Sequence, residues 1–414
     1  MQAARLFLAF AVFALPLFAD PEAVKKAREA SDARPQHPTL LYRLAQALDA
    51  DGQREEAARA LERVAAMGFV YPIAKDFPHQ RYAEVAKRFG ANAQPIGSAR
   101  REFAIERLGL IPEGMAWDGK RFFVSSVRTS TIFAGDKPFA TAPWGVFGMA
   151  ADPKRGVLWA VTAALPQVEG FKAEDKGKSA LLRIDLRTGE ILETLRAPEG
   201  EHNFGDVAVA PDGEVYVSDS ATGTVYRSSS GFLGVPRSSS EGTAPTPLRG
   251  APRNPRNSEE LGAQLVPFVQ GPFRSLQGLA VSGEMLYAAD YSNGLFAIDR
   301  RTGDLRPLRV PATVSLLGID GLYAVDAATL VATQNGTNPF RILRIALSPG
   351  GLAVSSVQTL LANSPLMGDP TLGVVANGRF YFNGNAQWDL FDGDGKISDP
   401  VRLSEAVVLS VPLR

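Results

Sequence analysis

The feature that most constrains this chain is a short phrase that recurs through residues 104–414. Each copy joins a short apolar stretch, a turn rich in Gly and Asp, and a second apolar stretch that often carries an aromatic residue. A single hairpin of this kind cannot bury its own apolar face, so the repetition predicts several stacked sheets. Six copies predict a mainly β fold, a six-bladed β-propeller. The copies begin at residues 112, 147, 205, 277, 320 and 372.

Recurring turns predict four strands in each blade. Residues 184–190 and 298–304 are near copies, and their glycine suits the positive φ of a hairpin between the two outer strands. The final apolar stretch, 407–413, is expected to complete a blade whose other strands come from elsewhere in the chain, which would remove an exposed sheet edge. Residues 228–262 are rich in Ser, Pro, Gly and Arg without periodicity, and we expect a flexible insertion there.

The first nineteen residues have the pattern of a secretory signal. Arg5 precedes an apolar stretch at 6–18, and Ala19 offers a cleavage site. The stretch is short for a membrane span, so an uncleaved anchor is the alternative, and no span is expected after cleavage. The chain has no Cys, which excludes lipoprotein attachment, disulfides and thiolate chemistry. We therefore expect a periplasmic or secreted protein.

Charge gives no support for binding nucleic acid. Lys plus Arg and Asp plus Glu both number 44, so the chain has no net field that would attract a polyanion.

Residues 22–90 are expected to be helical. Apolar side chains at Leu41, Leu44 and Leu48 form one stripe, and a second stripe begins after Gly52. Two antiparallel helices joined at Asp51-Gly52 resemble a tetratricopeptide unit, although only about one and a half units fit. The segment would be a structural cap on the propeller or a binding site for a protein partner.

The position before each inner strand of a propeller faces the central channel. Glu113 and Asp320, with the amide Gln277, are expected to converge there from blades one, five and four. Two adjacent carboxylates repel each other, and a hard cation removes that cost; carboxylate and amide oxygens are the ligands that Ca²⁺ and Mg²⁺ take. The pattern therefore predicts a site for Ca²⁺ or another divalent cation. The other ring positions hold Phe147, Gly205 and Leu372.

These phrases resemble the SMP-30/gluconolactonase family of six-bladed propellers, within the calcium-dependent phosphotriesterase superfamily, over about residues 104–413. Similarity to strictosidine synthase-like and NHL-repeat proteins is looser. The resemblance implies that Glu113 and Asp320 bind a divalent metal, together with an Asn at the position where this chain has Gln277. It also implies that Asp320 serves as acid/base in lactone hydrolysis. Gly205 stands where the family often has a substrate-binding Asn.

The expected chemistry is metal-dependent hydrolysis of a lactone or related ester, with Asp320, or His202 near the rim, accepting a proton from water. Three alternatives remain open. In the first, Glu113 and Asp320 only satisfy backbone amides. In the second, they hold a metal without turnover. In the third, they belong to a propeller that binds a small ligand or a protein without catalysis. The residues expected to contact a substrate are Asn203, Asp206, Asp369, Asn335 and Asn385.

One further motif resembles a cation-binding loop. Residues 389–397 resemble an EF-hand loop, but the acidic residues fall out of register and no Glu stands at the twelfth position, so a blade turn is the preferred interpretation.

Overall fold

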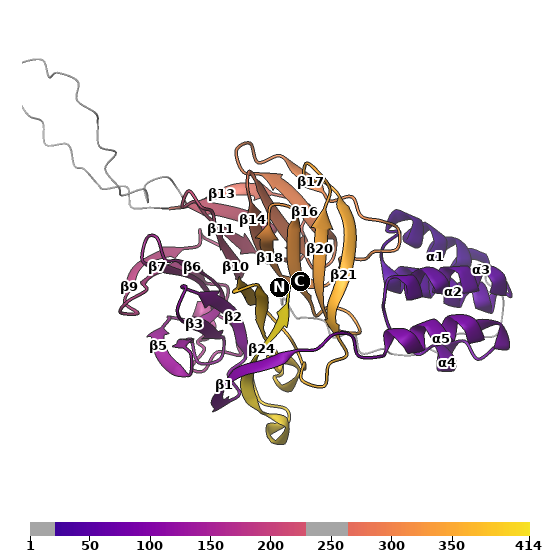
Figure 1. Cartoon of the computed structure of the whole chain (residues 1–414), viewed down its shortest axis with the longest axis horizontal. Coiled ribbons are helices and arrows are strands. Elements are labelled where there is room, and N and C mark those ends of the chain that lie inside the picture. The colour runs from indigo at the N-terminus through magenta and orange to yellow at the C-terminus, as the bar shows by residue number, and fades with distance from the viewer. Residues whose placement is uncertain (1–20, 229–263) are drawn as a thin grey trace, which may run out of the picture.

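The computed structural model describes residues 21–228 and 264–414 and contains an N-terminal group of helices followed by a propeller (Figure 1). The expected signal and all but the first residue of the expected insertion lie outside the described residues. The helical elements are α1 (Pro21–Ala33), α2 (Pro38–Ala50), α3 (Arg54–Ala66), α4 (Ile73–Asp76), the 3-10 turn η1 (Gln80–Tyr82) and α5 (Ala83–Asn92).

The helical pair expected around Gly52 is present as α2 and α3. Their apolar stripes are buried against each other, and Gly52 has the positive φ of 78° that the connecting turn requires. None of the helices in residues 21–228 and 264–414 combines the length and apolar character needed to cross a bilayer.

The propeller consists of six four-stranded antiparallel sheets, as the repeats predicted. The inner strand of each sheet contacts the inner strands of its two neighbours, which closes a ring. In Figure 1 the blades follow one another around the axis, and the helices lie beside the fifth blade.

The strands of blades one to five follow in chain order from the axis outward. Blade one contains β2 (Pro112–Trp117), β3 (Phe122–Ser126), β4 (Thr131–Ala134) and β5 (Lys137–Thr141); blade two contains β6 (Gly145–Asp152), β7 (Val157–Ala163), β8 (Ser179–Asp185) and β9 (Ile191–Arg196). Blade three contains β10 (Phe204–Val209), β11 (Val215–Asp219), β12 (Thr224–Ser228) and β13 (Leu265–Gln270); blade four contains β14 (Leu276–Ser282), β15 (Met285–Asp290), β16 (Gly294–Asp299) and β17 (Leu305–Pro307). Blade five contains β18 (Ile319–Asp326), β19 (Thr329–Gln334), β20 (Arg341–Leu347) and β21 (Val354–Ala362).

The sixth blade joins the two ends of the propeller. From the axis outward it contains β22 (Gly373–Ala376), β23 (Arg379–Asn383), β24 (Glu405–Pro412) and β1 (Arg100–Leu108). The last strand is therefore third in its sheet, and the outermost strand comes from just after the helices. The ring is closed by the β1–β24 ladder, in which Arg100 pairs with Ser410 and Ala104 with Val407.

A bulge interrupts each of the first five inner strands at the same point. The ladder between the first two strands of the blade slips between Pro112 and Met115 in blade one and between Leu276 and Leu279 in blade four, with equivalent slips in blades two, three and five. A bulge re-aims the side chain that it carries. Five of the six ring residues thus lie inside the inner strands, at bulges, whereas Leu372 precedes β22 as the sequence suggested.

Glycine follows the ring residue because neighbouring inner strands approach backbone to backbone. A Cβ atom at Gly278 would lie 2.6 Å from both the carbonyl oxygen of Asp320 and the amide nitrogen of Leu322. A Cβ atom at Gly114 would overlap the carbonyl oxygen of Phe147. The glycines at 114, 148 and 278 are therefore set by packing between neighbouring inner strands.

This packing predicts a large difference between two glycines. Gly278→Ala should lower the free energy of unfolding by about 2 kcal/mol, since the added methyl group forces two inner strands apart. Gly393→Ala is the matched control, because nothing lies within 4 Å of its Cβ position and neither glycine has a positive φ. Denaturant unfolding measures both; equal stability of the two variants would contradict a packing origin for the glycine.

Candidate functional site

Two buried carboxyl groups act on a third near the propeller axis. Glu113 lies in β2, Asp206 in β10 and Asp320 in β18, and all three are buried. The negative charges of Asp320 and Glu113 both act on Asp206. Side chains from blades one, three and five thus form one group, which we call the axial carboxyl group.

Asp206 occupies the position where the other inner strands have glycine. Its Oδ2 accepts a hydrogen bond of 2.9 Å from the amide of Leu279 in blade four, and its Oδ1 occupies the space where a Cβ atom at Gly148 would lie. Burial raises the pKa of Asp206 to about 7, with the charges of Asp320 and Glu113 acting in the same direction against two backbone amides that lower it. This carboxyl group therefore exchanges its proton near neutral pH.

Glu113 is held by a tryptophan from the sixth blade. The indole Nε1 of Trp388 donates to Glu113 Oε2 at 2.9 Å, and the Trp388 ring stacks on Phe147 with 6.4 Å between ring centroids. Trp388 begins the 3-10 turn η4 (Trp388–Leu390) in the long connection between β23 and β24. The second-to-third-strand connection of blade six thus supplies the donor that orients Glu113.

Asp320 is held by the amide that follows the second strand of its own blade. Asn335 Nδ2 donates to Asp320 Oδ2 at 2.7 Å and to the carbonyl oxygen of Pro370 at 2.8 Å. Tyr291 donates its hydroxyl to Asn335 Oδ1 at 3.1 Å, which fixes the orientation of the amide. The structure therefore brings Asn335 to the axial carboxyl group, as the sequence suggested, but as a partner of Asp320.

Gln277 directs its amide oxygen over Gly205. A Cβ atom at Gly205 would lie 3.4 Å from Gln277 Oε1, and Gln277 Nε2 donates to Ser275 Oγ at 3.1 Å. Gly205 and Gln277, the two positions that depart from the expected motif, are thus neighbours in the structure.

His202 belongs to a separate buried pair. Its Nδ1 lies 2.6 Å from Asp219 Oδ2, and its Nε2 is buried without a hydrogen-bond partner in the described part of the chain. The ring packs near Phe204 and Tyr226, with centroid distances of 6.2 Å to each. No described contact joins His202 to Glu113 or Asp320.

The remaining expected substrate contacts have structural partners. Asn203 Nδ2 donates to Ser220 Oγ at 2.9 Å, and Asp369 Oδ2 accepts from the amide of Trp388 at 3.2 Å. Asn385 donates to the carbonyl of Glu405 and accepts from Val407, so it ties the long connection of blade six to β24. Asp369 is therefore linked to the tryptophan beside Glu113, whereas the side chain of Asn385 bonds to the blade edge.

Tyr323 is a member of this region that the sequence analysis missed. Burial, followed by the charge of Asp206 and those of Asp320 and Glu113, holds its pKa well above the usual value for tyrosine. Its hydroxyl oxygen accepts a hydrogen bond of 2.8 Å from the amide of Gly373. Tyr323 lies two residues after Gly321 on the same strand, and alternate residues of a strand face the same side. This spacing could have indicated from the sequence that Tyr323 lies near the axis.

The loop 389–397 is a tight turn and not a ligand cage. Asp392 Oδ1 accepts hydrogen bonds of 2.9 Å from the amides of Asp394 and Lys396, and a bridge pairs Phe391 with Ile397. The turn lies between the second and third strands of blade six, facing the 164–178 connection of blade two, where Gln167 donates to the carbonyl of Asp392 at 2.9 Å.

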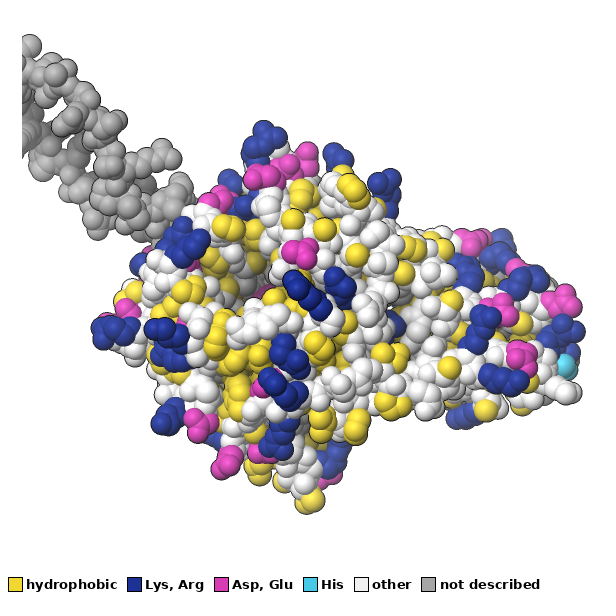
Figure 2. Space-filling model, in the orientation of Figure 1, with side chains coloured by type: hydrophobic (Ala, Val, Ile, Leu, Met, Phe, Trp, Pro, Cys, Tyr) yellow, Lys and Arg dark blue, Asp and Glu magenta, His cyan; other side chains and the backbone are white. Residues whose placement is uncertain are grey.

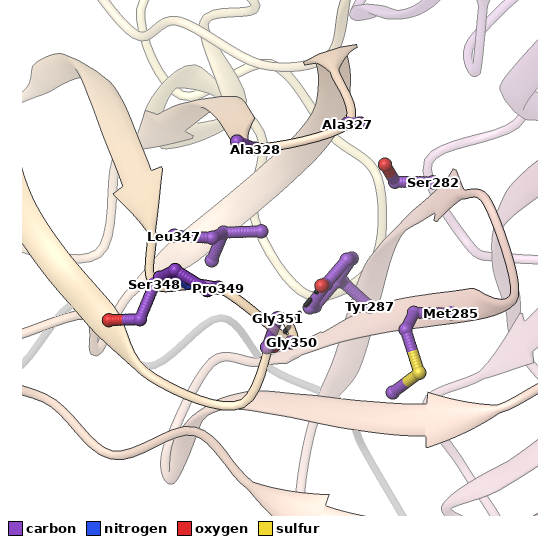
Figure 3. A pocket seen from close by; sticks show the side chains of 10 residues that line it. All are labelled: Ser282, Met285, Tyr287, Ala327, Ala328, Leu347, Ser348, Pro349, Gly350 and Gly351. Atoms are coloured by element: carbon purple, nitrogen blue, oxygen red, sulfur yellow. Dashed lines mark hydrogen bonds between the residues drawn. The ribbon is translucent and has the colours of Figure 1, made fainter.

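A pocket of about 310 Å³ lies away from the axial carboxyl group (Figure 3). Its lining residues include those at the turns between the first two strands of blades four and five, near Ser282 and Ala328. These turns lie at the end of β14 opposite Gln277. Tyr287 donates to the carbonyl of Gly351 at 3.1 Å, and no carboxylate lines the pocket. The pocket offers no acid, base or cation ligand.

The axial carboxyl group predicts a pH-dependent stability. In the unfolded chain Asp206 ionises near its ordinary pKa of 3.8, whereas in the folded chain it keeps its proton to about pH 7. The free energy of unfolding contributed by this residue therefore falls as pH rises from about 4 to about 7 and is flat above. Asp206→Asn should remove that fall, a relative gain on the order of 4 kcal/mol at pH 7.

Denaturant unfolding from pH 4 to 8 in EDTA would measure the difference between wild type and variant. Asp136→Asn, in an exposed turn, is the control and should show no such difference. A difference between wild type and Asp206→Asn that does not change with pH would show that Asp206 is ionised throughout.

Comparisons with known proteins find similar folds at low sequence identity. No family model matches the chain, and no curated protein matches it. Virginiamycin B lyase of Staphylococcus aureus is 10% identical with a TM-score of 0.45, over 77% of this chain and 99% of the other. A protein assigned as a glucose dehydrogenase of Thermus thermophilus is 16% identical (TM-score 0.44, 76% and 99%), and a protein assigned to the gluconolactonases is 17% identical (TM-score 0.44, 76% and 94%). These likenesses concern the fold alone, so the function is inferred from this chain's own residues.

Proposed function

We propose that the chain is a divalent-cation-dependent hydrolase of lactones or related esters, acting at the mouth of the propeller channel. The observation that carries this proposal is the axial carboxyl group. Its members come from three blades, and burial raises the pKa of Asp206 with a smaller contribution from the charges of Asp320 and Glu113. A divalent cation would relieve the repulsion between these charges.

The donor types are those that a hard cation takes, although residues 21–228 and 264–414 contain no group of three or more His, Cys, Asp or Glu side chains arranged to hold a metal ion. Glu113 and Asp320 offer carboxylate oxygens, and Gln277 offers an amide oxygen that is directed into the space over Gly205. These are the ligand types that Ca²⁺ and Mg²⁺ take. A cation held by these three residues would supply positive charge to polarise an ester carbonyl.

Residues of this chain would transfer the protons and limit the access of water during hydrolysis. Asp320, fixed by Asn335, would take the proton from a water that attacks the ester carbonyl and return it to the alkoxide oxygen as the ring C–O bond breaks. Trp388 holds Glu113 and presents its ring beside Phe147, which gives the mouth an apolar wall that limits water. Asp206, with a pKa of about 7, would serve as a neighbouring proton reservoir.

A propeller that binds a ligand or protein without catalysis is the second candidate. It is favoured by the hydrogen bonds that Trp388 and Asn335 already make to Glu113 and Asp320. Backbone amides were expected as partners of Glu113 and Asp320 in the separate, purely structural alternative, whereas Trp388 and Asn335 donate from their side chains. In this candidate the helical segment would recruit the partner.

We also propose that the protein acts outside the cytoplasm. The support is the apolar stretch at 6–18 and the absence of Cys from the whole chain.

Cation binding is tested by neutralising the two carboxylates. Glu113→Gln and Asp320→Asn should each weaken Ca²⁺ binding at least about tenfold in titration calorimetry, because each removes a charged ligand. Asp394→Asn is the control, since this exposed residue lies in the aspartate-rich turn and its loss should leave the affinity unchanged. Unchanged affinity in both axial variants would remove the assignment.

Turnover is tested with a panel of lactones, with Ca²⁺ and with a chelator. Wild type should hydrolyse at least one member only with the cation, and Asp320→Asn should lower kcat by about 10²–10⁴-fold, as expected for loss of a general base. Cation binding without any hydrolysis would instead support the non-catalytic propeller.

A further inference from the structure

The helical segment contacts the propeller at the connection that holds Asp320. The amide of Val70 donates to the carbonyl of Asn338 at 2.9 Å, three residues after Asn335. On the other side of the contact, Asn363 donates to the carbonyl of Asn92 at 2.9 Å, and Ile96 pairs with Ala362 at the end of β21. The helices are thus docked on blade five, the blade that carries Asp320 (Figure 1).

Arg341 lies buried at the centre of this contact. Its Nη1 donates to the carbonyl of Met67 at 2.8 Å, and its guanidinium carbon lies 4.4 Å from the centroid of the Phe69 ring. No Asp or Glu of residues 21–228 and 264–414 pairs with it, and burial lowers its pKa to about 10. A cation buried without a carboxylate depends on these helical-segment contacts.

Arg341 in turn fixes an amide that braces the start of β18. Its Nε donates to Gln334 Oε1 at 2.8 Å. Gln334 Nε2 donates to the carbonyl oxygens of Leu317 at 2.7 Å and Ser315 at 3.2 Å, in the connection that leads to Asp320. Because Arg341 occupies the amide oxygen, the NH₂ group of Gln334 must face those carbonyls.

The same connection packs against the residues around Asn335. The amide of Gly336 donates to the carbonyl of Gly318 at 3.0 Å, and a Cβ atom at Gly318 would lie 2.8 Å from Gly336 Cα. A shift of Gln334 would therefore move both the backbone that bears Asp320 and the amide of Asn335 that bonds to it.

We infer that Arg341 is a positioning residue through which the helical segment fixes Asp320 at the axial site. The inference rests on the proposed function only for the role of Asp320 as a cation ligand. It assigns the helical segment a part in forming the site, beyond capping the propeller. A protein that pulled on the segment around Met67 and Phe69 would loosen Asp320 by the same route.

A substitution at Gly68 would disturb this contact while leaving the sequence of Arg341 and of the whole propeller unchanged. It follows α3 with a φ of 82°, and a Cβ atom there would lie 2.6 Å from Arg341 Nη1. Gly52 is the matched control, because it has a φ of 78° in a turn of the same segment but has nothing within 4 Å of its Cβ position. Both Ala variants carry the same backbone strain, and only Gly68→Ala displaces the guanidinium.

The experiment compares wild type, Gly68→Ala, Gly52→Ala, Arg341→Lys and Arg341→Gln in the full chain. Hydrogen exchange is measured on peptides covering 315–322 and 334–341, and Ca²⁺ affinity by calorimetry. Gly68→Ala and Arg341→Gln should speed exchange in both peptides and weaken Ca²⁺ binding by about tenfold, the lower end for partners that orient a metal ligand. Arg341→Lys should change the exchange rate and the Ca²⁺ affinity less than Arg341→Gln does. Gly52→Ala should change neither quantity.

The outcomes separate this inference from the proposed function. Faster exchange in Gly68→Ala with no Ca²⁺ binding even in wild type would uphold the coupling and reject the cation site. Ca²⁺ binding that is equal in all variants, or exchange that rises equally in Gly52→Ala and Gly68→Ala, would overturn the positioning role.

Discussion

The contact between the backbones of neighbouring inner strands is the constraint on which the rest of this structure depends. At Gly278 the next blade lies so close that even a methyl group would meet Asp320 O and Leu322 N at 2.6 Å. The bulges in the first five inner strands lie at this level and re-aim the side chains that they carry. Glu113 and Asp320 each stand just before such a glycine, and Asp206 replaces one.

Asp206 shows the consequence of such a replacement. Its carboxyl group fits because its Oδ2 accepts the Leu279 amide and its Oδ1 uses the space that Gly148 leaves. Burial at that position raises its pKa to about 7, and the charges of Asp320 and Glu113 act in the same direction. The surface charge of the protein is unrelated to this local field: Lys, Arg, Asp and Glu side chains are spread over both the propeller and the helices in the face that Figure 2 shows.

The fold was predictable because its determinants are local and repeated. Glycine after the ring residue, the aromatic second strand and the Asp-x-x-Thr-Gly turn are each features of a single blade, and the recurrence of the inner-strand phrase indicates the ring. The site was predictable only in part. Glu113 and Asp320 stood in the repeat, whereas Trp388 reaches Glu113 from a connection with no repeat, 275 residues away in sequence. The pairing of His202 with Asp219 is a different case, because it lies within the hairpin of a single blade, beside the Phe204–Asp219 pair.

The helical segment directly precedes β1, the strand that completes blade six, and it also contacts blade five. The chain leaves α5, pairs Ile96 with Ala362 at the edge of blade five, and then forms β1, the outer strand that closes blade six. Blades five and six follow one another directly in the chain, so it is the pairing of β1 with β24 that joins the last blade to the first, and the helical segment that precedes β1 lies against blade five. Arg341 adds the energetic link, because the guanidinium stays buried only while Phe69 and the Met67 carbonyl cover it. Ring closure by β1 and burial of Arg341 thus both depend on the stretch of chain that begins with the helical segment.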